Sequence, residues 1–137
     1  MNTTFTLQPG TLSLAQLRQW WDAPQQLALH ADAQQVIERS QQTVLNILAD
    51  GKVVYGINTG FGLLANTRIP PDRLNDLQRR IVLSHAAGTQ ELMSDTVVRL
   101  MLLLKINSLS RGYSGVRLEV IEALVDMLNQ QVYPCVP

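Results

Sequence analysis

The stretch "VVRLMLLLKI", Val97–Ile106, is the most apolar part of this 137-residue chain and decides its fold class. It contains Arg99 and Lys105, and it is shorter than the roughly 20 apolar residues needed to cross a bilayer. We therefore expect a helix that is buried among other helices rather than a membrane-spanning segment.

The rest of the chain shows further helical segments, each marked by capping residues, by proline or by apolar residues at helical spacing. The predicted helices are residues 14–21 after Thr11 or Ser13, 33–50 after Asp32, 72–88 ending at Gly88, a helix capped by Ser94 or Asp95 that runs to about Arg111 or Gly112, and 115–131 after Ser114. Short extended pieces are expected at residues 5–9 and 52–57, the second because it is rich in β-branched residues. The fold is thus predicted to be mainly α, with one or two short strands and a glycine-rich loop.

The overall composition excludes several classes of partner. Acidic and basic residues balance to a net charge of zero, so nothing favours nucleic acid or an anionic membrane. The single cysteine, Cys135, has no partner for an intramolecular disulfide, which fits a reducing, cytoplasmic location. One cysteine and two histidines far apart in the chain make no metal-binding pattern, so no metal is expected.

The loop "YGINTGFG", Tyr55–Gly62, is unusual because three of its residues are glycine. Gly56, Gly60 and Gly62 allow positive φ angles and a close approach of the backbone to a ligand. Their spacing, G-x-x-x-G-x-G, matches neither a phosphate-binding P-loop nor a dinucleotide-binding loop. From the residues alone, a surface turn with a half-buried Tyr55 is the simpler interpretation, and a binding loop is the alternative.

His85 continues an apolar face that Leu74, Leu77 and Ile81 form on the predicted helix 72–88. A histidine in such a place is more often a packed core residue than a ligand-binding residue. The small residues that follow it leave space beside the imidazole, so a pocket near the end of this helix is the alternative.

Three segments, taken in order, resemble the aromatic amino acid ammonia-lyases and aminomutases. They are "YGINTGFG" (55–62), "LQRRIVLSHAAG" (77–88) and "LLLKINSLSRGYSGVR" (102–117), and their order and spacing agree across nearly the whole chain. The resemblance implies a larger helical-bundle enzyme that removes ammonia from an amino acid. It also implies an electrophilic prosthetic group, methylidene-imidazolone (MIO), which forms from an internal Ala-Ser-Gly sequence.

The resemblance gives the glycine-rich loop a purpose. It implies that Tyr55 is a catalytic residue, the general base that takes a proton from the β-carbon of the substrate. The residues implied to support the loop that carries it are Gly56, Asn58, Gly60 and Gly62. Such a loop is expected to fold over the substrate and to reopen, as lids do.

The pair Ser84-His85 resembles the histidine-specific members of the family. The implied reaction is the non-oxidative deamination of L-histidine to trans-urocanate and ammonia. In this reading His85 orients the substrate imidazole and Ser84 leaves room beside it. A tyrosine ammonia-lyase or aminomutase stays open, because some tyrosine aminomutases have a similar segment, and a non-catalytic helical binding module is a third alternative.

The chain departs from the family in one respect, because it contains no Ala-Ser-Gly; Ser114-Gly115 follows Tyr113. We therefore expect residues 1–137 to be the N-terminal part of the enzyme, truncated before the MIO-forming sequence and the central helical bundle, and inactive alone. The family's active form is a homotetramer in which neighbouring subunits complete each site. The isolated chain is accordingly expected to expose apolar helix faces and to associate.

Overall fold

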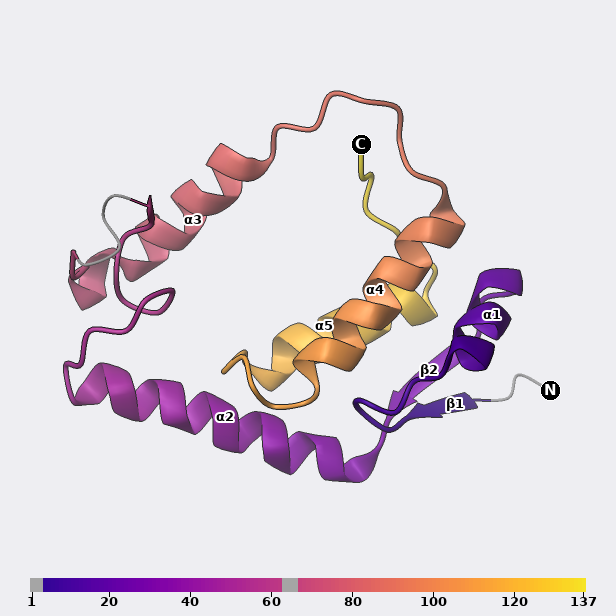
Figure 1. The fold of residues 1–137 in the computed structure, drawn as a ribbon, viewed down its shortest axis with the longest axis horizontal. Helices are drawn as coiled ribbons and strands as arrows, with labels where there is room; N and C mark the ends of the chain where they lie inside the picture. Colours follow the sequence, from indigo (N-terminus) through magenta and orange to yellow (C-terminus); the bar gives the residue numbers. More distant parts are fainter. Residues whose placement is uncertain (1–3, 63–66) are drawn as a thin grey trace. The chain divides into compact units, whose positions relative to one another are not determined.

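The computed structural model describes residues 4–62 and 67–137 (Figure 1). Within these residues the chain forms five α-helices, one 3₁₀ turn and two short strands, which confirms the predicted mainly α fold. The elements are β1 (Thr4–Leu7), α1 (Leu14–Asp22), β2 (Gln26–Leu29), α2 (Ala31–Ala49), the 3₁₀ turn η2 (Pro71–Arg73), α3 (Leu74–His85), α4 (Asp95–Leu109) and α5 (Leu118–Asn129). None of the described helices is both long enough and apolar enough to span a membrane.

The chain divides into two compact units, which we call the core unit and the loop unit. The core unit comprises the residues up to Gln42 together with Gln90–Pro137, and the loop unit comprises Thr43–Thr89. Helix α2 contributes to both. The buried helix predicted around residues 97–106 and the glycine-rich loop therefore belong to different units.

The two strands of the core unit pair in parallel, with Phe5 opposite Leu27. Strand β1 lies close to the extended piece expected at residues 5–9, whereas β2 is not predicted by the sequence. The side chain of Asn129, at the end of α5, accepts a hydrogen bond from the Leu27 amide (2.7 Å) and donates one to the Leu27 carbonyl (2.9 Å). β2 is thus fixed by groups distant in the chain, which local propensity does not reveal.

Helix α1 begins and ends where its local sequence predicts. Ser13 is its N-cap and forms a capping box with Gln16, so two amides that the helix leaves unpaired are satisfied. The helix ends at Asp22, shortly before Pro24, because proline cannot continue a helix.

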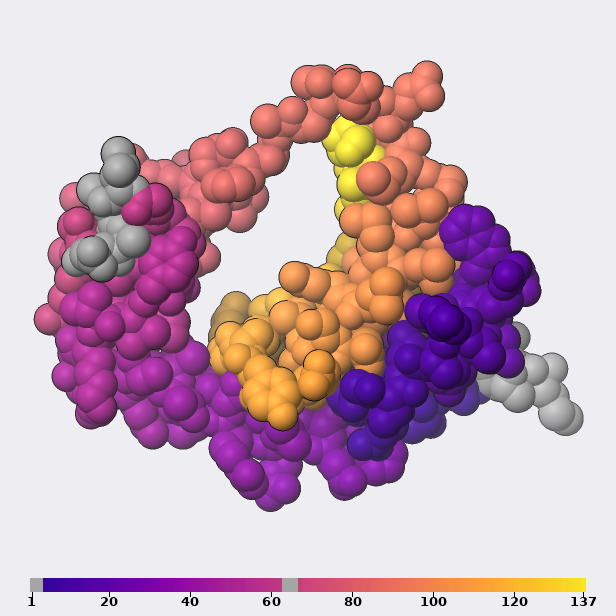
Figure 2. Space-filling model, viewed as in Figure 1, coloured from indigo at the N-terminus to yellow at the C-terminus, as the bar shows by residue number. Residues whose placement is uncertain are grey.

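Arg99 joins the end of α1 to α4. Its side chain is buried, with 7% of the residue exposed, and donates to the carbonyl oxygens of Trp20 and Trp21, both at 2.7 Å. These carbonyls have no partner within the helix, and a cation is favourable at the negative end of the helix dipole. The space-filling view shows α1, in indigo, directly against α4, in orange (Figure 2).

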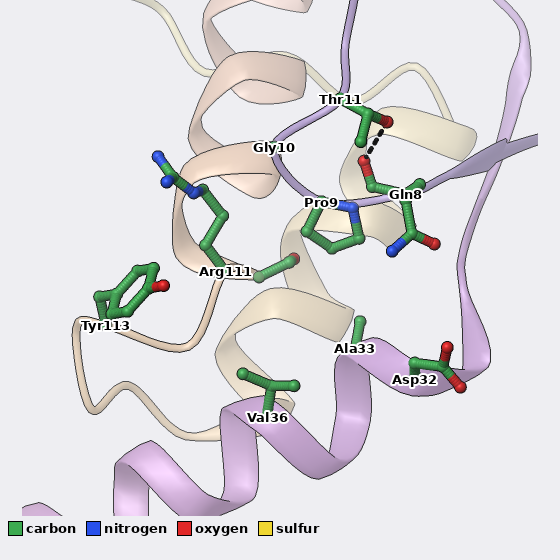
Figure 3. Close-up of a pocket in the computed structure, with 10 residues that line it drawn as sticks. Gln8, Pro9, Gly10, Thr11, Asp32, Ala33, Val36, Arg111 and Tyr113 are labelled. Atoms are coloured by element: carbon green, nitrogen blue, oxygen red, sulfur yellow. Dashed lines mark hydrogen bonds between the residues drawn. The ribbon is translucent and has the colours of Figure 1, made fainter.

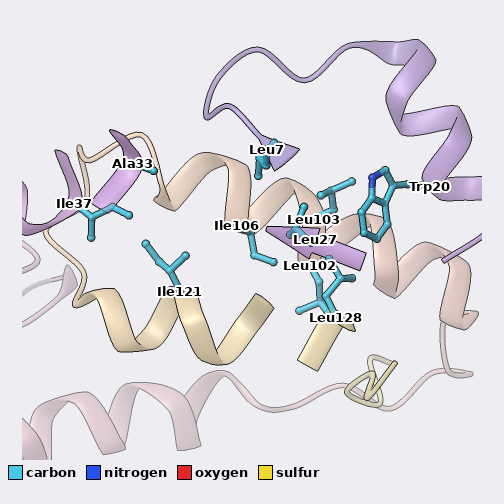
Figure 4. Close-up of a cluster of buried hydrophobic side chains, with 10 residues drawn as sticks. All are labelled: Leu7, Trp20, Leu27, Ala33, Ile37, Leu102, Leu103, Ile106, Ile121 and Leu128. Carbon is cyan, nitrogen blue, oxygen red and sulfur yellow. The ribbon is translucent and has the colours of Figure 1, made fainter. Parts of the chain in front are cut away.

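The hydrophobic core of this unit lies between α4, α5 and the elements of the N-terminal part of the chain. α4 and α5 run in opposite directions (Figure 1), and Leu103 and Ile106 of α4 are fully buried, as predicted for residues 97–106. The buried cluster, drawn in Figure 4, consists of Leu7, Trp20, Leu27, Ala33, Ile37, Leu102, Leu103, Ile106, Ile121 and Leu128. Complete burial of one such aliphatic side chain stabilises the fold by about 1.5–3 kcal/mol.

Two predicted helix starts are wrong. α2 begins at Ala31, so Asp32 lies in its first turn and is not the N-cap. α5 begins at Leu118 rather than after Ser114. Gly115 has a positive φ of 66°, and its amide donates to the Ser40 hydroxyl at 3.0 Å, which keeps this segment out of the helix.

Two further predictions fail in the loop unit. Helix α3 ends at His85 rather than at Gly88, because Ala86 has non-helical backbone angles (φ −80°, ψ 67°) and the Ala87 amide donates to the His85 carbonyl at 2.9 Å instead of to a carbonyl four residues earlier. Residues 52–57 form no strand, since 52–54 have no regular secondary structure and 55–57 form a turn. The expected stop after α2 is confirmed, because Gly51 has a positive φ of 65°.

Candidate functional site

The glycine-rich loop is built around the side chain of Asn58, which is 3% exposed. Its Oδ1 accepts a hydrogen bond from the Val54 amide (2.8 Å), and its Nδ2 donates to the Lys52 carbonyl (2.7 Å). The Asn58 main-chain carbonyl accepts from the Ile69 amide at 2.9 Å. The side chain thus makes hydrogen bonds that a neighbouring strand would otherwise make, which explains why residues 52–57 form no strand.

The return of the chain closes the base of the loop. Thr59 and Arg68 form an isolated antiparallel bridge, and the Gly60 amide donates to the Thr67 carbonyl at 3.0 Å. Thr59 is 1% exposed, so the base of the loop is buried although its residues are polar. Residues 63–66, between these two sides, lie outside the described residues.

Tyr55 projects from this base, and 63% of the residue is exposed. Its ring meets the ring of Phe61 edge to face, with centroids 5.6 Å apart and an interplanar angle of 61°. Such aromatic pairs contribute about 0.5–1.5 kcal/mol beyond the area they bury. The half-buried, packed tyrosine that the residues alone favoured is therefore wrong, and the phenol is presented to the solvent.

Two of the glycines give the loop its shape. Gly56 has a φ of 79° and Gly62 a φ of 58°, values that strain any residue with a side chain. Among the described residues, and apart from the chain neighbours, a Cβ added at either position would meet no atom within 4 Å, so the requirement comes from the backbone conformation. Gly60 differs, because it is buried at the base of the loop and its amide is paired.

Ser84 and His85 lie in the last turn of α3, and both are exposed. The Nδ1 atom of His85 is 2.8 Å from the Ile81 carbonyl and 3.1 Å from the Ser84 hydroxyl. Ser84 in turn donates to the same carbonyl at 3.0 Å. The expectation that His85 continues a packed apolar face is therefore wrong for this chain, and its ring is fixed by polar neighbours.

The described contacts do not bring the two groups of predicted residues together. Within residues 4–62 and 67–137, no hydrogen bond or ring contact joins Tyr55 to Ser84 or His85. A shallow depression of about 170 Å³ lies in the same unit, beside η2 and the start of α3, but none of these three side chains lines it. The loop and the end of α3 are two separate parts of a candidate site.

Two residues that shape the loop were not predicted from the sequence. Phe61 provides the ring against which Tyr55 rests, and Thr59 is the buried half of the bridge. An aromatic residue between two glycines was the signal for Phe61. Nothing in the sequence marked Thr59, because its burial depends on Arg68 at the other side of the loop.

A larger depression lies in the core unit, between the turn before α1, the start of α2 and the end of α4 (Figure 3). Its volume is about 320 Å³, and none of the predicted site residues lines it. Two of its lining residues contact each other, since the guanidinium of Arg111 lies over the Tyr113 ring, 5.5 Å from its centre. Among the described residues, no group of three or more His, Cys, Asp or Glu side chains is arranged to hold a metal ion.

Comparison with known proteins places these features in a family context. The aromatic amino acid lyase family matches the chain over residues 12–137. A histidine ammonia-lyase of Idiomarina loihiensis is 65% identical over 133 residues, which are 97% of this chain and 26% of that protein. A histidine ammonia-lyase of Vibrio vulnificus is 64% identical over 132 residues, 96% of this chain and 26% of that protein. The chain thus spans about a quarter of the length of these curated relatives.

Solved structures give the same picture of the fold. The crystal structure of histidine ammonia-lyase from Trypanosoma cruzi is similar with a TM-score of 0.87 and 31% identity, covering 98% of this chain and 26% of that one. The ergothionase of Treponema denticola is similar with a TM-score of 0.93 and 27% identity, covering 98% of this chain and 27% of that one. The chain therefore has the fold of one part of these larger helical enzymes.

Proposed function

Because the chain belongs to the aromatic amino acid lyase family, we propose that its protein is an ammonia-lyase that converts L-histidine to trans-urocanate and ammonia. The observation that carries this proposal is the 65% identity, over 97% of the chain, to a protein named histidine ammonia-lyase. The exposed Tyr55 phenol on a loop fixed at its base supports it, because a general base must reach the substrate.

Tyr55 is the proposed general base, and the residues around it are proposed to position it. The side-chain hydrogen bonds of Asn58 hold the loop backbone on which Tyr55 stands. The Phe61 ring packs against the phenol ring, and 63% of Tyr55 stays exposed. In this role the deprotonated oxygen of Tyr55 takes a proton from the β-carbon of the substrate, the C–H electrons form the double bond, and the amino group leaves the α-carbon with the C–N electrons.

Ser84 and His85 are the proposed substrate-binding residues. The His85 imidazole is exposed at the end of α3 and is held at one nitrogen, so its other nitrogen is directed away from its own helix contacts. A hydrogen bond from this ring to a polar substrate side chain favours histidine over phenylalanine.

The prosthetic group MIO is proposed for the whole protein, where it would supply the electrophile that engages the substrate. The residues of this chain do not fit its formation, because no Ala-Ser-Gly occurs and Ser114-Gly115 follows Tyr113. No step of the reaction is therefore assigned to MIO within this chain. The match to 26% of the relatives' length supports the proposal that residues 1–137 are the N-terminal part of the enzyme and inactive alone.

A homotetramer in the cytoplasm is proposed as the working form, with sites completed by neighbouring subunits. Apolar side chains that are exposed on α3 support an association, since Val82 and Leu83 are 66% and 61% exposed. Sedimentation of the isolated chain tests this point. We expect self-association, and a monodisperse monomer would count against it.

The direct test of the reaction uses the intact protein with L-histidine and, separately, with L-tyrosine. Ultraviolet absorbance distinguishes urocanate from coumarate, and we expect urocanate and ammonia. Coumarate without urocanate would replace the proposal by the tyrosine-specific alternative. Absence of both products, in intact protein that is folded, would favour the non-catalytic binding module.

A further inference from the structure

The imidazole of His85 has a well-defined set of neighbours in the last turn of α3. Its Nδ1 lies 2.8 Å from the Ile81 carbonyl oxygen and 3.1 Å from the Ser84 hydroxyl oxygen. The Ser84 hydroxyl itself donates to the Ile81 carbonyl at 3.0 Å. Two oxygen atoms thus lie within hydrogen-bond distance of Nδ1, and they also contact each other.

These contacts decide which ring nitrogen carries the proton of the neutral imidazole. A carbonyl oxygen only accepts hydrogen bonds, so its 2.8 Å contact with Nδ1 is favourable only when Nδ1 bears the hydrogen. An unprotonated Nδ1 would direct its lone pair at the lone pairs of the Ile81 oxygen. The Ser84 hydroxyl, which gives its own proton to Ile81, offers a second acceptor to the same Nδ1–H.

We propose that Ser84 and the Ile81 carbonyl hold neutral His85 in the Nδ1–H tautomer and so make Nε2 a hydrogen-bond acceptor for the substrate ring. The part of this proposal that concerns the substrate rests on the proposed function. Ser84 then does more than leave room beside the substrate. It is a positioning residue, because it acts through the ring of His85.

An acceptor at Nε2 defines the chemical class of side chain that the site takes. It matches a ring with a hydrogen to donate, such as the N–H of an imidazole or the O–H of a phenol. A phenyl ring has no such hydrogen. When it binds, Nε2 loses its hydrogen bond to water and gains none from the substrate. We expect this loss to lower the selectivity for L-phenylalanine relative to L-histidine by roughly tenfold to a hundredfold.

His30 provides an internal contrast, because its Nδ1 is placed to accept rather than to donate. The Asp32 amide, in the first turn of α2, donates to this Nδ1 at 3.3 Å. The Asp32 carboxylate lies 3.4 Å from the same nitrogen and would favour a proton there. The amide determines the tautomer of the neutral ring, since its hydrogen is fixed by the backbone, whereas the carboxylate side chain is 81% exposed to solvent. We therefore expect the Nε2–H tautomer at His30.

The test is the nitrogen chemical shifts of the two histidine rings in the 137-residue chain, labelled with ¹⁵N-histidine. The chain contains two histidines, and a His30→Gln variant assigns their signals. At about pH 9, where an ordinary imidazole is neutral, we expect a protonated Nδ1 at His85 and a protonated Nε2 at His30. A protonated Nε2 at His85, or the tautomer ratio of free histidine, would overturn the proposal.

A Ser84→Ala variant tests the role of the hydroxyl separately. Removing one of the two acceptors is expected to lower the ratio of Nδ1–H to Nε2–H tautomers at His85 by severalfold to about tenfold. Ser94→Ala is the matched control, since Ser94 makes no side-chain capping bond at the start of α4. An unchanged ratio in Ser84→Ala would remove Ser84 from the account.

Failure of this inference and failure of the proposed function are distinguishable. The ring shifts report the tautomer without any reaction, and the urocanate assay reports the reaction without reference to the tautomer. An active protein with a protonated Nε2 at His85 contradicts the inference alone. A protonated Nδ1 in a protein that does not act on L-histidine contradicts the function alone.

Discussion

Different interactions stabilise the core unit and the loop unit, each within itself. The buried residues of the core unit are mostly aliphatic or aromatic and form one cluster around α4. In the described part of the loop unit, the buried residues are Asn58, Thr59 and Gly60, and α3 buries none. The proposed catalytic and substrate-binding residues all lie in the loop unit, where hydrogen bonds replace an apolar core. Segments of this kind open at low free energy, as a loop that admits substrate must.

The largest effect is expected from Tyr55→Phe in the intact protein. Removing the hydroxyl removes the proposed base but keeps the ring and its contact with Phe61. Turnover of L-histidine should fall by about 10²–10⁴-fold, the usual scale for loss of a general base. Tyr113→Phe is the matched control, because Tyr113 is also exposed, at 84%, but lies in the core unit. Equal rates in both variants would remove Tyr55 from its role.

The next largest effect concerns the core unit. Leu103→Ala empties a site that is 0% exposed and should lower the free energy of unfolding by about 2–5 kcal/mol. The neighbouring Leu104→Ala, at a residue that is 44% exposed, should cost much less. Urea unfolding followed by tryptophan fluorescence measures this unit, because both tryptophans, Trp20 and Trp21, belong to it. Equal losses would show that the core is not where the structure places it.

A smaller, local effect is expected from Asn58→Ala in the loop unit. The Val54 amide and the Lys52 carbonyl lose their partner, at about 1–3 kcal/mol for each group that stays buried. Hydrogen exchange at Val54 and Ile69 should accelerate, while the tryptophan-detected unfolding of the core unit changes little. Asn75→Ala, at an exposed position of α3, is the control. Unchanged exchange at Val54 would contradict the role assigned to Asn58.

The smallest effect is expected from Phe61→Leu. It removes the edge-to-face contact with Tyr55, which is worth about 0.5–1.5 kcal/mol, and keeps an apolar side chain. In the intact protein kcat should fall by no more than about tenfold, because the base remains but is less well positioned. A loss as large as that of Tyr55→Phe would mean that Phe61 does more than support the ring.

Features that depend on neighbours in the chain were predictable from the sequence. The capping box of Ser13 and Gln16, the end of α1 before Pro24 and the stop at Gly51 each follow from a few adjacent residues. The buried helix around residues 97–106 followed from its apolar run. The glycine-rich loop was recognised as unusual from three glycines that lie close together in the sequence.

Features that depend on distant partners were not predictable. Strand β2 needs Asn129 for the hydrogen bonds of Leu27, and the end of α1 needs Arg99. Residues 52–57 have β-branched side chains but no strand to pair with, and Asn58 takes their hydrogen bonds instead. In the candidate site, the exposure of Tyr55 and the polar contacts of the His85 ring likewise became clear only from the structure.

The central claim is that Tyr55 stands on a loop fixed by hydrogen bonds rather than by an apolar core. Residue-resolved hydrogen exchange of the chain tests it directly, by comparing the amides of Val54 and Ile69 with those of Leu103 and Ile106. We predict that the loop amides are protected at least about tenfold less, and that low urea leaves their exchange unchanged while it accelerates exchange in α4. Equal protection with the same dependence on urea would mean that one cooperative core holds both units, and it would contradict the account.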